Sequence, residues 1–170
     1  IGIKMGADRL HDYIGDYGFG QRTGLLLPGE VRGLVYPVKN WSKVSIAQIP
    51  MGHGVAVTPL QMTMAMCAIA NHGQRMRPKI VDRLEDENHN LIVKYPPQPV
   101  RQVISENADR EIVKALKTVV MPEGTAPKAA LEHYTVAGKT GTAQKAEHGV
   151  YVSGKYFSSF IGFFPADSPE

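Results

Sequence analysis

The chain has 170 residues, of which 43% are hydrophobic and 21% charged, a composition typical of one globular domain with its own core. Its net charge of +3 comes from dispersed basic residues, so the composition gives no support for a nucleic-acid partner. The single cysteine, Cys67, excludes an internal disulfide and multi-cysteine metal sites, and no run approaches the roughly 18 apolar residues that cross a bilayer.

Helical spacing of apolar residues predicts three helices, over about 1–17, 59–72 and 107–120. Gly18 provides a C-terminal signal for the first, and Thr58 followed by Pro59 is a typical helix start for the second. The second helix is apolar nearly all round, so we expect it to be buried on most sides, with the thiol of Cys67 packed inside.

Runs of strand-forming residues predict the remaining elements. Two short runs separated by EDENHN predict a hairpin over about 79–95. Further strands are expected over about 134–144 and 156–164. The polar, glycine-bearing stretch 145–155 would join them as a long loop, of a length that suits a lid beside a site.

One serine in the chain imitates a catalytic motif. Ser105-Glu106-Asn107 spells Ser-x-Asn, but it stands directly before the third predicted helix, in which acidic residues come early and lysines late. We therefore interpret Ser105 as the N-cap of that helix and not as a catalytic serine.

The candidate site lies in the strand over 134–144, in the sequence Lys139-Thr140-Gly141-Thr142. Alternation along a strand puts Lys139 and Gly141 on one face and Thr140 and Thr142 on the other. Gly138 and Gly141 are poor strand formers, and a glycine in a strand usually marks the close approach of a ligand or another backbone.

Three interpretations of this segment compete. A phosphate loop would need a glycine where the chain has His133, and a helix after Thr140, so it is disfavoured. The second is an exposed strand with a solvated lysine. The third is the Lys-Thr-Gly motif of the penicillin-recognising serine enzymes, which binds a carboxylate and an acyl group.

The neighbouring sequence favours the third interpretation. Four blocks resemble, in this order, the transpeptidase domain of class B penicillin-binding proteins, the bacterial enzymes that cross-link the cell wall: FGQRTGLLLPGE, MGHGVAVTPLQMTMAMCAIANHG, VAGKTGTAQK and KYFSSFIGFFPADSPE. The resemblance implies an α/β (α+β) fold of the serine-β-lactamase type, with an antiparallel sheet flanked by helices. Residues 1–170 would then be the C-terminal portion of such a domain.

The resemblance also implies a chemistry for the site. The hydroxyls of Thr140 and Thr142 would hold the carboxylate of a substrate or β-lactam, and the backbone N–H of Thr142 would supply one oxyanion donor. Lys139 would raise the local positive potential, and Gly141 would let the substrate lie against the strand. The implied ligands are a peptidoglycan stem peptide ending in D-Ala-D-Ala and β-lactams, with no cofactor and no metal.

A nucleophile is not evident in the sequence. None of the seven serines is followed by lysine three residues on, as the activated serine of these enzymes requires. We therefore expect this chain to be a fragment of the transpeptidase domain that lacks the nucleophile and the family's Ser-x-Asn motif. Such a fragment would be inactive alone. It would depend on the missing N-terminal part of the same protein.

The family implies a location on the extracytoplasmic (periplasmic) face of the bacterial cytoplasmic membrane, and contact with other cell-wall synthesis proteins. The MGHG and FIGFFPADSPE sequences favour a role in cell division over cell elongation. The alternative is a protein of another class, a non-catalytic domain that binds peptides or proteins along the edge of the Lys139 strand.

Overall fold

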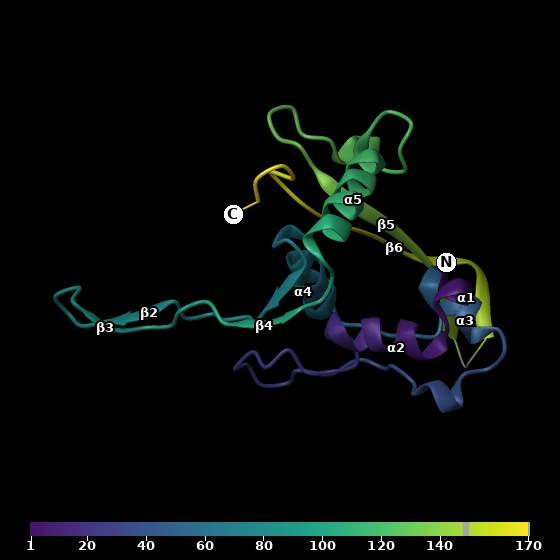
Figure 1. Cartoon of the computed structure of the whole chain (residues 1–170), viewed down its shortest axis with the longest axis horizontal. Coiled ribbons are helices and arrows are strands. Elements are labelled where there is room, and N and C mark those ends of the chain that lie inside the picture. Colours follow the sequence, from purple (N-terminus) through teal and green to yellow (C-terminus); the bar gives the residue numbers. More distant parts are fainter. Residues whose placement is uncertain (148–149, 170) are drawn as a thin grey trace.

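The computed structural model describes residues 1–147 and 150–169. Helices and antiparallel strands occupy separate stretches of the chain, which is an α+β architecture (Figure 1). In chain order the elements are α1 (Gly2–Met5), α2 (Ala7–Asp16), η1 (Val38–Asn40), α3 (Ser45–Gln48), η2 (Ile49–Met51), α4 (Pro59–Ala70), β1 (Gln74–Met76), β2 (Arg83–Glu85), β3 (Leu91–Lys94), β4 (Pro99–Gln102), α5 (Glu106–Lys117), η3 (Thr118–Val120), η4 (Pro127–Ala129), β5 (Ala137–Glu147) and β6 (Val150–Phe163).

The first predicted helix is two helices, so the expectation of one helix over 1–17 is wrong. Gly6 separates α1 from α2 with a φ of +88°, a conformation that glycine adopts easily and that helices do not contain. Beyond α2, Gly18 and Phe19 donate to carbonyls of the last helical turn, which is the C-terminal capping that the sequence predicted.

Helix α4 begins with a complete capping box. The Thr58 hydroxyl accepts from the backbone N–H of Gln61, and the Gln61 side chain accepts from the backbone N–H of Thr58. The predicted burial on most sides is wrong, because only one face is buried and Met62, Thr63 and Cys67 are exposed. The thiol of Cys67 was expected to be packed and is exposed, although neighbouring atoms desolvate it enough to raise its pKa.

The strands form three separate antiparallel pairs, β1 with β4, β2 with β3 and β5 with β6. The β2–β3 pair is the hairpin predicted over 79–95, and it extends from the rest of the molecule as an arm (Figure 1). Helix α4 packs against β1 and β6, while α5 packs against β5 and α4. The β5–β6 pair is therefore the part of the molecule on which both long helices converge.

The strands β5 and β6 are longer than predicted, and the expected loop over 145–155 is wrong. Strand β5 continues to Glu147 and β6 starts at Val150, with Ala146 opposite Tyr151 and Glu147 opposite Val150. The register shifts between Gln144 and Ala146, so residues 152–155 belong to β6 but bulge out of the pairing. At the other end β5 begins at Ala137 and not at residue 134. No long lid therefore connects the two strands; the two residues between them, 148 and 149, lie outside the described part.

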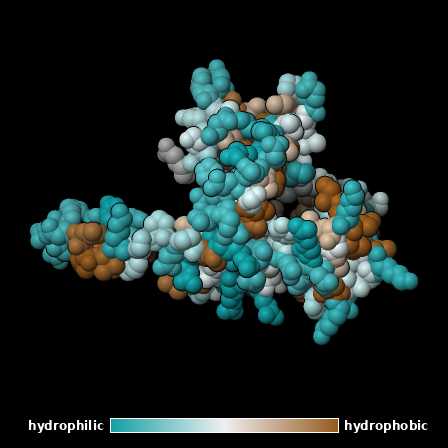
Figure 2. Space-filling view, viewed as in Figure 1, coloured by the Kyte–Doolittle hydropathy of each residue, from teal (hydrophilic) through white to brown (hydrophobic). Residues whose placement is uncertain are grey.

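The core is smaller than the composition suggested. Among the described residues the buried apolar side chains are few and mostly small: Ala65, Met66, Ala68, Val103, Val136, Ala137 and Ala166. Large apolar side chains are exposed instead, including Leu26 at 97% and Phe157 at 64%. Figure 2 shows hydrophobic residues gathered on the arm and near the N-terminus. None of the helices in the described residues is both long and apolar enough to span a membrane.

Candidate functional site

The candidate site lies on β5 at residues 139–142, and its geometry follows from the register with β6. Lys139 lies opposite Ile161 and Gly141 opposite Ser159, while Thr140 lies opposite Phe160 and Thr142 opposite Ser158. Residues directly opposite in an antiparallel pair share a face. The ladder therefore holds the two threonines on one face of β5 and Lys139 with Gly141 on the other, the division that alternation predicted.

The outer edge of β5 is open. Among the described residues β5 pairs with β6 and with no other strand, so its second edge offers unpaired backbone groups. Lys139 and Thr142 are exposed at this edge, and Thr140 and Gly141 are half-buried. An extended ligand could add to this edge by backbone hydrogen bonds and meet the threonine hydroxyls at the same time.

The amine of Lys139 donates to the backbone carbonyl of the next residue, Thr140, at 2.7 Å. This contact holds the positive charge against the backbone of β5 at Thr140.

The glycines of β5 are explained by the neighbouring strand. A Cβ on Gly138 would lie 2.5 Å from Cζ of Phe160 and 2.9 Å from the carbonyl oxygen of Ile161. A Cβ on Gly141 would lie 2.6 Å from the hydroxyl of Ser159. The close approach inferred for both glycines therefore comes from β6, and a role of Gly141 in accommodating a ligand stays a prediction.

A further hydroxyl lies at the site that the sequence did not predict. The Thr125 and Thr140 hydroxyl oxygens are 3.0 Å apart, although fifteen residues separate them. Thr125 follows Gly124 in the loop after η3. Gly-Thr-Ala-Pro is recognisable as a loop sequence, but no local pattern indicates which strand residue such a loop contacts.

The serines do not supply an evident nucleophile. The Ser105 hydroxyl accepts from the backbone N–H of Ala108 at 3.3 Å, which confirms its interpretation as the N-cap of α5. Ser42 and Ser45 hydrogen-bond to each other at 3.1 Å. Within residues 1–147 and 150–169, no group of three or more His, Cys, Asp or Glu side chains could hold a metal ion.

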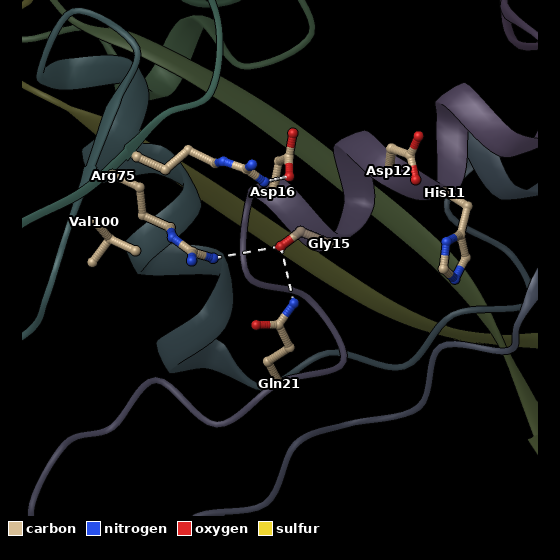
Figure 3. A pocket seen from close by; sticks show the side chains of 8 residues that line it. His11, Asp12, Gly15, Asp16, Gln21, Arg75 and Val100 are labelled. Atoms are coloured by element: carbon tan, nitrogen blue, oxygen red, sulfur yellow. Dashed lines mark hydrogen bonds and ion pairs between the residues drawn. The ribbon is translucent and has the colours of Figure 1, made fainter.

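A polar hollow of about 670 Å³ opens beside the C-terminal end of α2, and its lining comes from α2, Gln21, β1 and β4 (Figure 3). Arg75 and Arg101 lie opposite each other in the β1–β4 ladder. Arg75 points to the carbonyl oxygen of Gly15 at 3.5 Å, and Arg101 forms an ion pair with Asp16. Since the C-terminal end of a helix attracts cations, these contacts hold the end of α2 against the β1–β4 ladder. We therefore interpret the hollow as part of this packing and not as a ligand site.

One buried carboxylate has an oxygen without a hydrogen-bond partner. Asp109 in the first turn of α5 is 2% exposed, and its Oδ1 has no hydrogen-bond partner among the described residues. Burial raises the pKa of Asp109, and the nearby His72 opposes that rise. Burial, with a contribution from Asp109, raises the pKa of Tyr17 to about 12. Asp109 therefore affects the stability of the helix packing and does not take part in the β5 site.

Comparison with known proteins gives one consistent result. The family model described as "Penicillin binding protein transpeptidase domain" matches residues 1–170. Stage V sporulation protein D of Bacillus subtilis is 41% identical over the whole chain, which covers 26% of that protein. Peptidoglycan D,D-transpeptidase FtsI of Escherichia coli is 32% identical over the whole chain, which covers 27% of it.

Solved structures agree in fold. Penicillin binding protein 3 of Mycobacterium tuberculosis, complexed with ampicillin, matches 98% of this chain and 38% of its own with a TM-score of 0.90 and 36% identity. The transpeptidase domain of Burkholderia pseudomallei penicillin-binding protein 3 has a TM-score of 0.86 and 32% identity, covering 99% of this chain and 48% of its own. These matches confirm the predicted fold class. The chain spans about a quarter of the length of the curated relatives that it matches.

Proposed function

The chain belongs to the penicillin-binding protein transpeptidase family, and from this membership we propose that it forms the Lys-Thr-Gly portion of a serine-type D,D-transpeptidase. The reaction would be acyl transfer: a serine oxygen attacks the amide carbonyl before the terminal D-alanine, which leaves as the free amino acid, and an amine of a second stem peptide then takes the acyl group from the serine ester and restores the serine hydroxyl. The substrate class is a stem peptide ending in D-Ala-D-Ala, and β-lactams would react with the same serine.

The observation that carries the proposal is the arrangement of Thr140 and Thr142 on one face of β5, next to an edge that no described strand covers. Two hydroxyls on the same face, with one residue between them, can donate to the two oxygens of one carboxylate. Hydrogen bonds to a carboxylate are about twice as strong as those between neutral groups. The arrangement therefore suits recognition of a terminal or β-lactam carboxylate.

The remaining roles follow from position. Lys139, whose amine lies against the Thr140 carbonyl, would add positive potential that favours an anionic ligand. The backbone N–H of Thr142 would donate to the oxyanion that develops on the attacked carbonyl. Gly141 would let the ligand approach the strand without a side chain in its path.

The nucleophile would come from outside these 170 residues. The chain has no Ser-x-x-Lys sequence, and its one Ser-x-Asn sequence is used as a helix cap. We therefore propose that a serine-bearing segment of the same protein packs beside β5 to complete the site. On this proposal the chain alone is inactive.

The biological setting is also part of the proposal. One relative is named a peptidoglycan D,D-transpeptidase, and the solved structure of a similar penicillin-binding protein contains ampicillin. We propose that the protein acts on the extracytoplasmic side of a bacterial membrane, together with other cell-wall synthesis proteins, and that cell division is its setting. The sequences MGHG and FIGFFPADSPE support the division role.

The competing function, a self-contained domain that binds peptides without catalysis, receives no support. Such a domain would cover its apolar surface, whereas Leu26, Phe157 and other large apolar side chains are exposed here. Family membership over all 170 residues also indicates the enzyme class.

Intact mass spectrometry after incubation with a penicillin tests the proposal. We expect no adduct on the 170-residue chain alone and one penicilloyl adduct on the full-length protein, at a serine outside these residues. An adduct on the chain alone would refute the absence of a nucleophile. Reversible binding without any adduct on the full-length protein would favour the non-catalytic alternative.

A further inference from the structure

We propose that Thr125 is a positioning residue of the carboxylate site, which acts by orienting the hydroxyl of Thr140. This inference rests on the proposed function, because it assigns a partner to one of the two hydroxyls that would hold the ligand carboxylate. It adds a residue from a loop outside the Lys-Thr-Gly strand.

The contact itself is short and specific. The two hydroxyl oxygens are 3.0 Å apart, within the range of an O–H···O hydrogen bond. Thr140 lies on β5 and is half-buried, while Thr125 is exposed in the loop between η3 and η4. The contact thus joins two segments that meet only in the folded chain.

The loop that carries Thr125 is held in place by its backbone. Ala126 donates to the carbonyl of Val119 at 2.8 Å, and Gly124 donates to the carbonyl of Met121 at 2.8 Å. A Cβ on Gly124 would lie 2.3 Å from the Val119 carbonyl oxygen, so the loop turns tightly back on η3. Because η3 packs against β5, Thr125 is presented to the strand from a fixed frame.

The chemistry of a carboxylate fixes the direction of the hydrogen bonds. A hydroxyl has one proton to donate, and an ionised carboxylate can only accept. If Thr140 donates its proton to the ligand, its oxygen is left to accept from Thr125. In the arrangement that binds the ligand, Thr125 therefore donates a hydrogen bond to Thr140, and Thr140 donates one to the carboxylate.

These two linked hydrogen bonds would strengthen ligand binding in two ways. It removes the rotation by which the Thr140 proton could point away from the ligand. It also polarises the Thr140 hydroxyl, because linked hydrogen bonds reinforce one another. Thr125 needs no contact with the ligand to have either effect.

The test compares Thr125→Val, which keeps the shape of the side chain and removes the hydroxyl, with Thr125→Ser, which keeps the hydroxyl. The measurement is the second-order rate constant of acylation of the full-length protein by a penicillin. We expect Thr125→Val to lower it by about 3- to 10-fold, the effect of one hydrogen bond, and Thr125→Ser to stay within about 2-fold of the natural protein.

Two further comparisons separate positioning from a merely structural role. In a Thr140→Val background, Thr125→Val should have no additional effect, because the hydroxyl on which it acts is gone. With the methyl ester of the same penicillin, which lacks the carboxylate, Thr125→Val should likewise change nothing. Melting temperatures of all variants show whether each has folded.

Each outcome is decisive. The inference would be overturned if Thr125→Val lowered the rate constant equally in the natural and the Thr140→Val backgrounds. It would also be overturned if Thr125→Val lowered the rate constants for the penicillin and for its methyl ester equally. An unchanged rate constant for Thr125→Val, where the natural protein is acylated, would overturn it too, and the proposed function would survive that result. If the full-length natural protein is not acylated at all, the proposed function fails and the inference falls with it.

Discussion

The side-chain amide of Gln61 donates a hydrogen bond of 2.7 Å to the backbone carbonyl of Gln21, forty residues earlier in the chain. The same amide nitrogen donates to the carbonyl of Arg32 at 3.0 Å, and its oxygen accepts from the N–H of Thr58 at 2.9 Å. Gln61 is 1% exposed. One buried side chain therefore fastens the irregular segment 21–32 to the start of α4.

Replacing this amide should destabilise the protein. Gln61→Met keeps a similar volume but removes the buried partner of three backbone groups, at Gln21, Arg32 and Thr58, so we expect a loss of about 1–3 kcal/mol in the free energy of unfolding. Gln102→Met is the matched control: Gln102 also donates to two carbonyls, but it is exposed and water can replace it. Denaturant unfolding of the full-length protein measures both, and equal losses would contradict the role of burial.

Asp109 should make the folded protein less stable as the pH rises, which is the opposite of the usual effect of a carboxyl group. Burial raises its pKa in the folded state, so folding favours the protonated form. The stability linked to Asp109 is thus present below the unfolded pKa and is lost as pH rises through the folded pKa. The groups facing it are Tyr17 and His72, from the ends of α2 and α4.

The variant Asp109→Asn removes this titration. We expect it to match the natural protein at pH 3, below the unfolded pKa, and to be more stable at pH 8, by on the order of 1 kcal/mol, as judged by unfolding at both pH values. Glu111→Gln on the same helix is the control with the opposite sign, because a hydrogen bond from Lys114 lowers the pKa of Glu111. A gain from Asp109→Asn that is the same at both pH values would show that titration is not its cause.

Ser105 offers a test of helix capping against catalysis. Ser105→Ala removes the acceptor for the N–H of Ala108 and should lower stability by about 1 kcal/mol. Ser105→Asp keeps an acceptor and should retain most of that stability. Both variants should still form a penicilloyl adduct in the full-length protein, and loss of the adduct in either folded variant would mean that Ser105 takes part in the reaction.

The parts of the fold that sequence predicted well depend on local chemistry. The caps at Thr58 and Ser105 use partners three residues away, so a short motif contains all the information. The break at Gly6 was missed because the apolar spacing continues across it. A glycine at position 6 indicates only that a positive φ is possible. Whether the chain adopts that φ depends on how α1 packs against α2 and α3.

The features that the sequence did not predict depend on contacts between residues far apart in the sequence. Residues 145–155 contain the polar residues and glycine of a loop, yet the strands continue into this stretch, where Ala146 pairs with Tyr151 and Glu147 with Val150 beyond an irregularity in the register. At the site, alternation alone placed Thr140 and Thr142 on one face, since the period of a strand is fixed. Thr125 could not be predicted, because its position depends on the path of the chain after η3.

The two glycines of the site should respond differently to alanine. Gly138→Ala would displace the exposed Phe160 ring and press against the Ile161 carbonyl, a backbone group of the ladder that cannot easily move, and we expect a loss of about 1–3 kcal/mol. Gly141→Ala would meet only the Ser159 hydroxyl, which can rotate away, so its loss should be below about 1 kcal/mol. Thermal unfolding compares the two, and a Gly141→Ala variant as unstable as Gly138→Ala would show that Ser159 is fixed.

The paired residues Thr142 and Ser158 separate ligand recognition from sheet structure. They lie opposite each other on the same face of the ladder, and both carry hydroxyls, but only Thr142 lies on the strand that carries Lys139 and Thr140. Thr142→Val should lower the rate constant of acylation by a penicillin by about 10-fold or more, because a hydrogen bond to a charged group is lost. Ser158→Ala should change that rate constant by less than about 2-fold, since its position across the ladder takes it away from the edge that a ligand would use. Equal losses in the two variants would attribute the effect to the ladder, and no loss in Thr142→Val would exclude its hydroxyl from carboxylate binding.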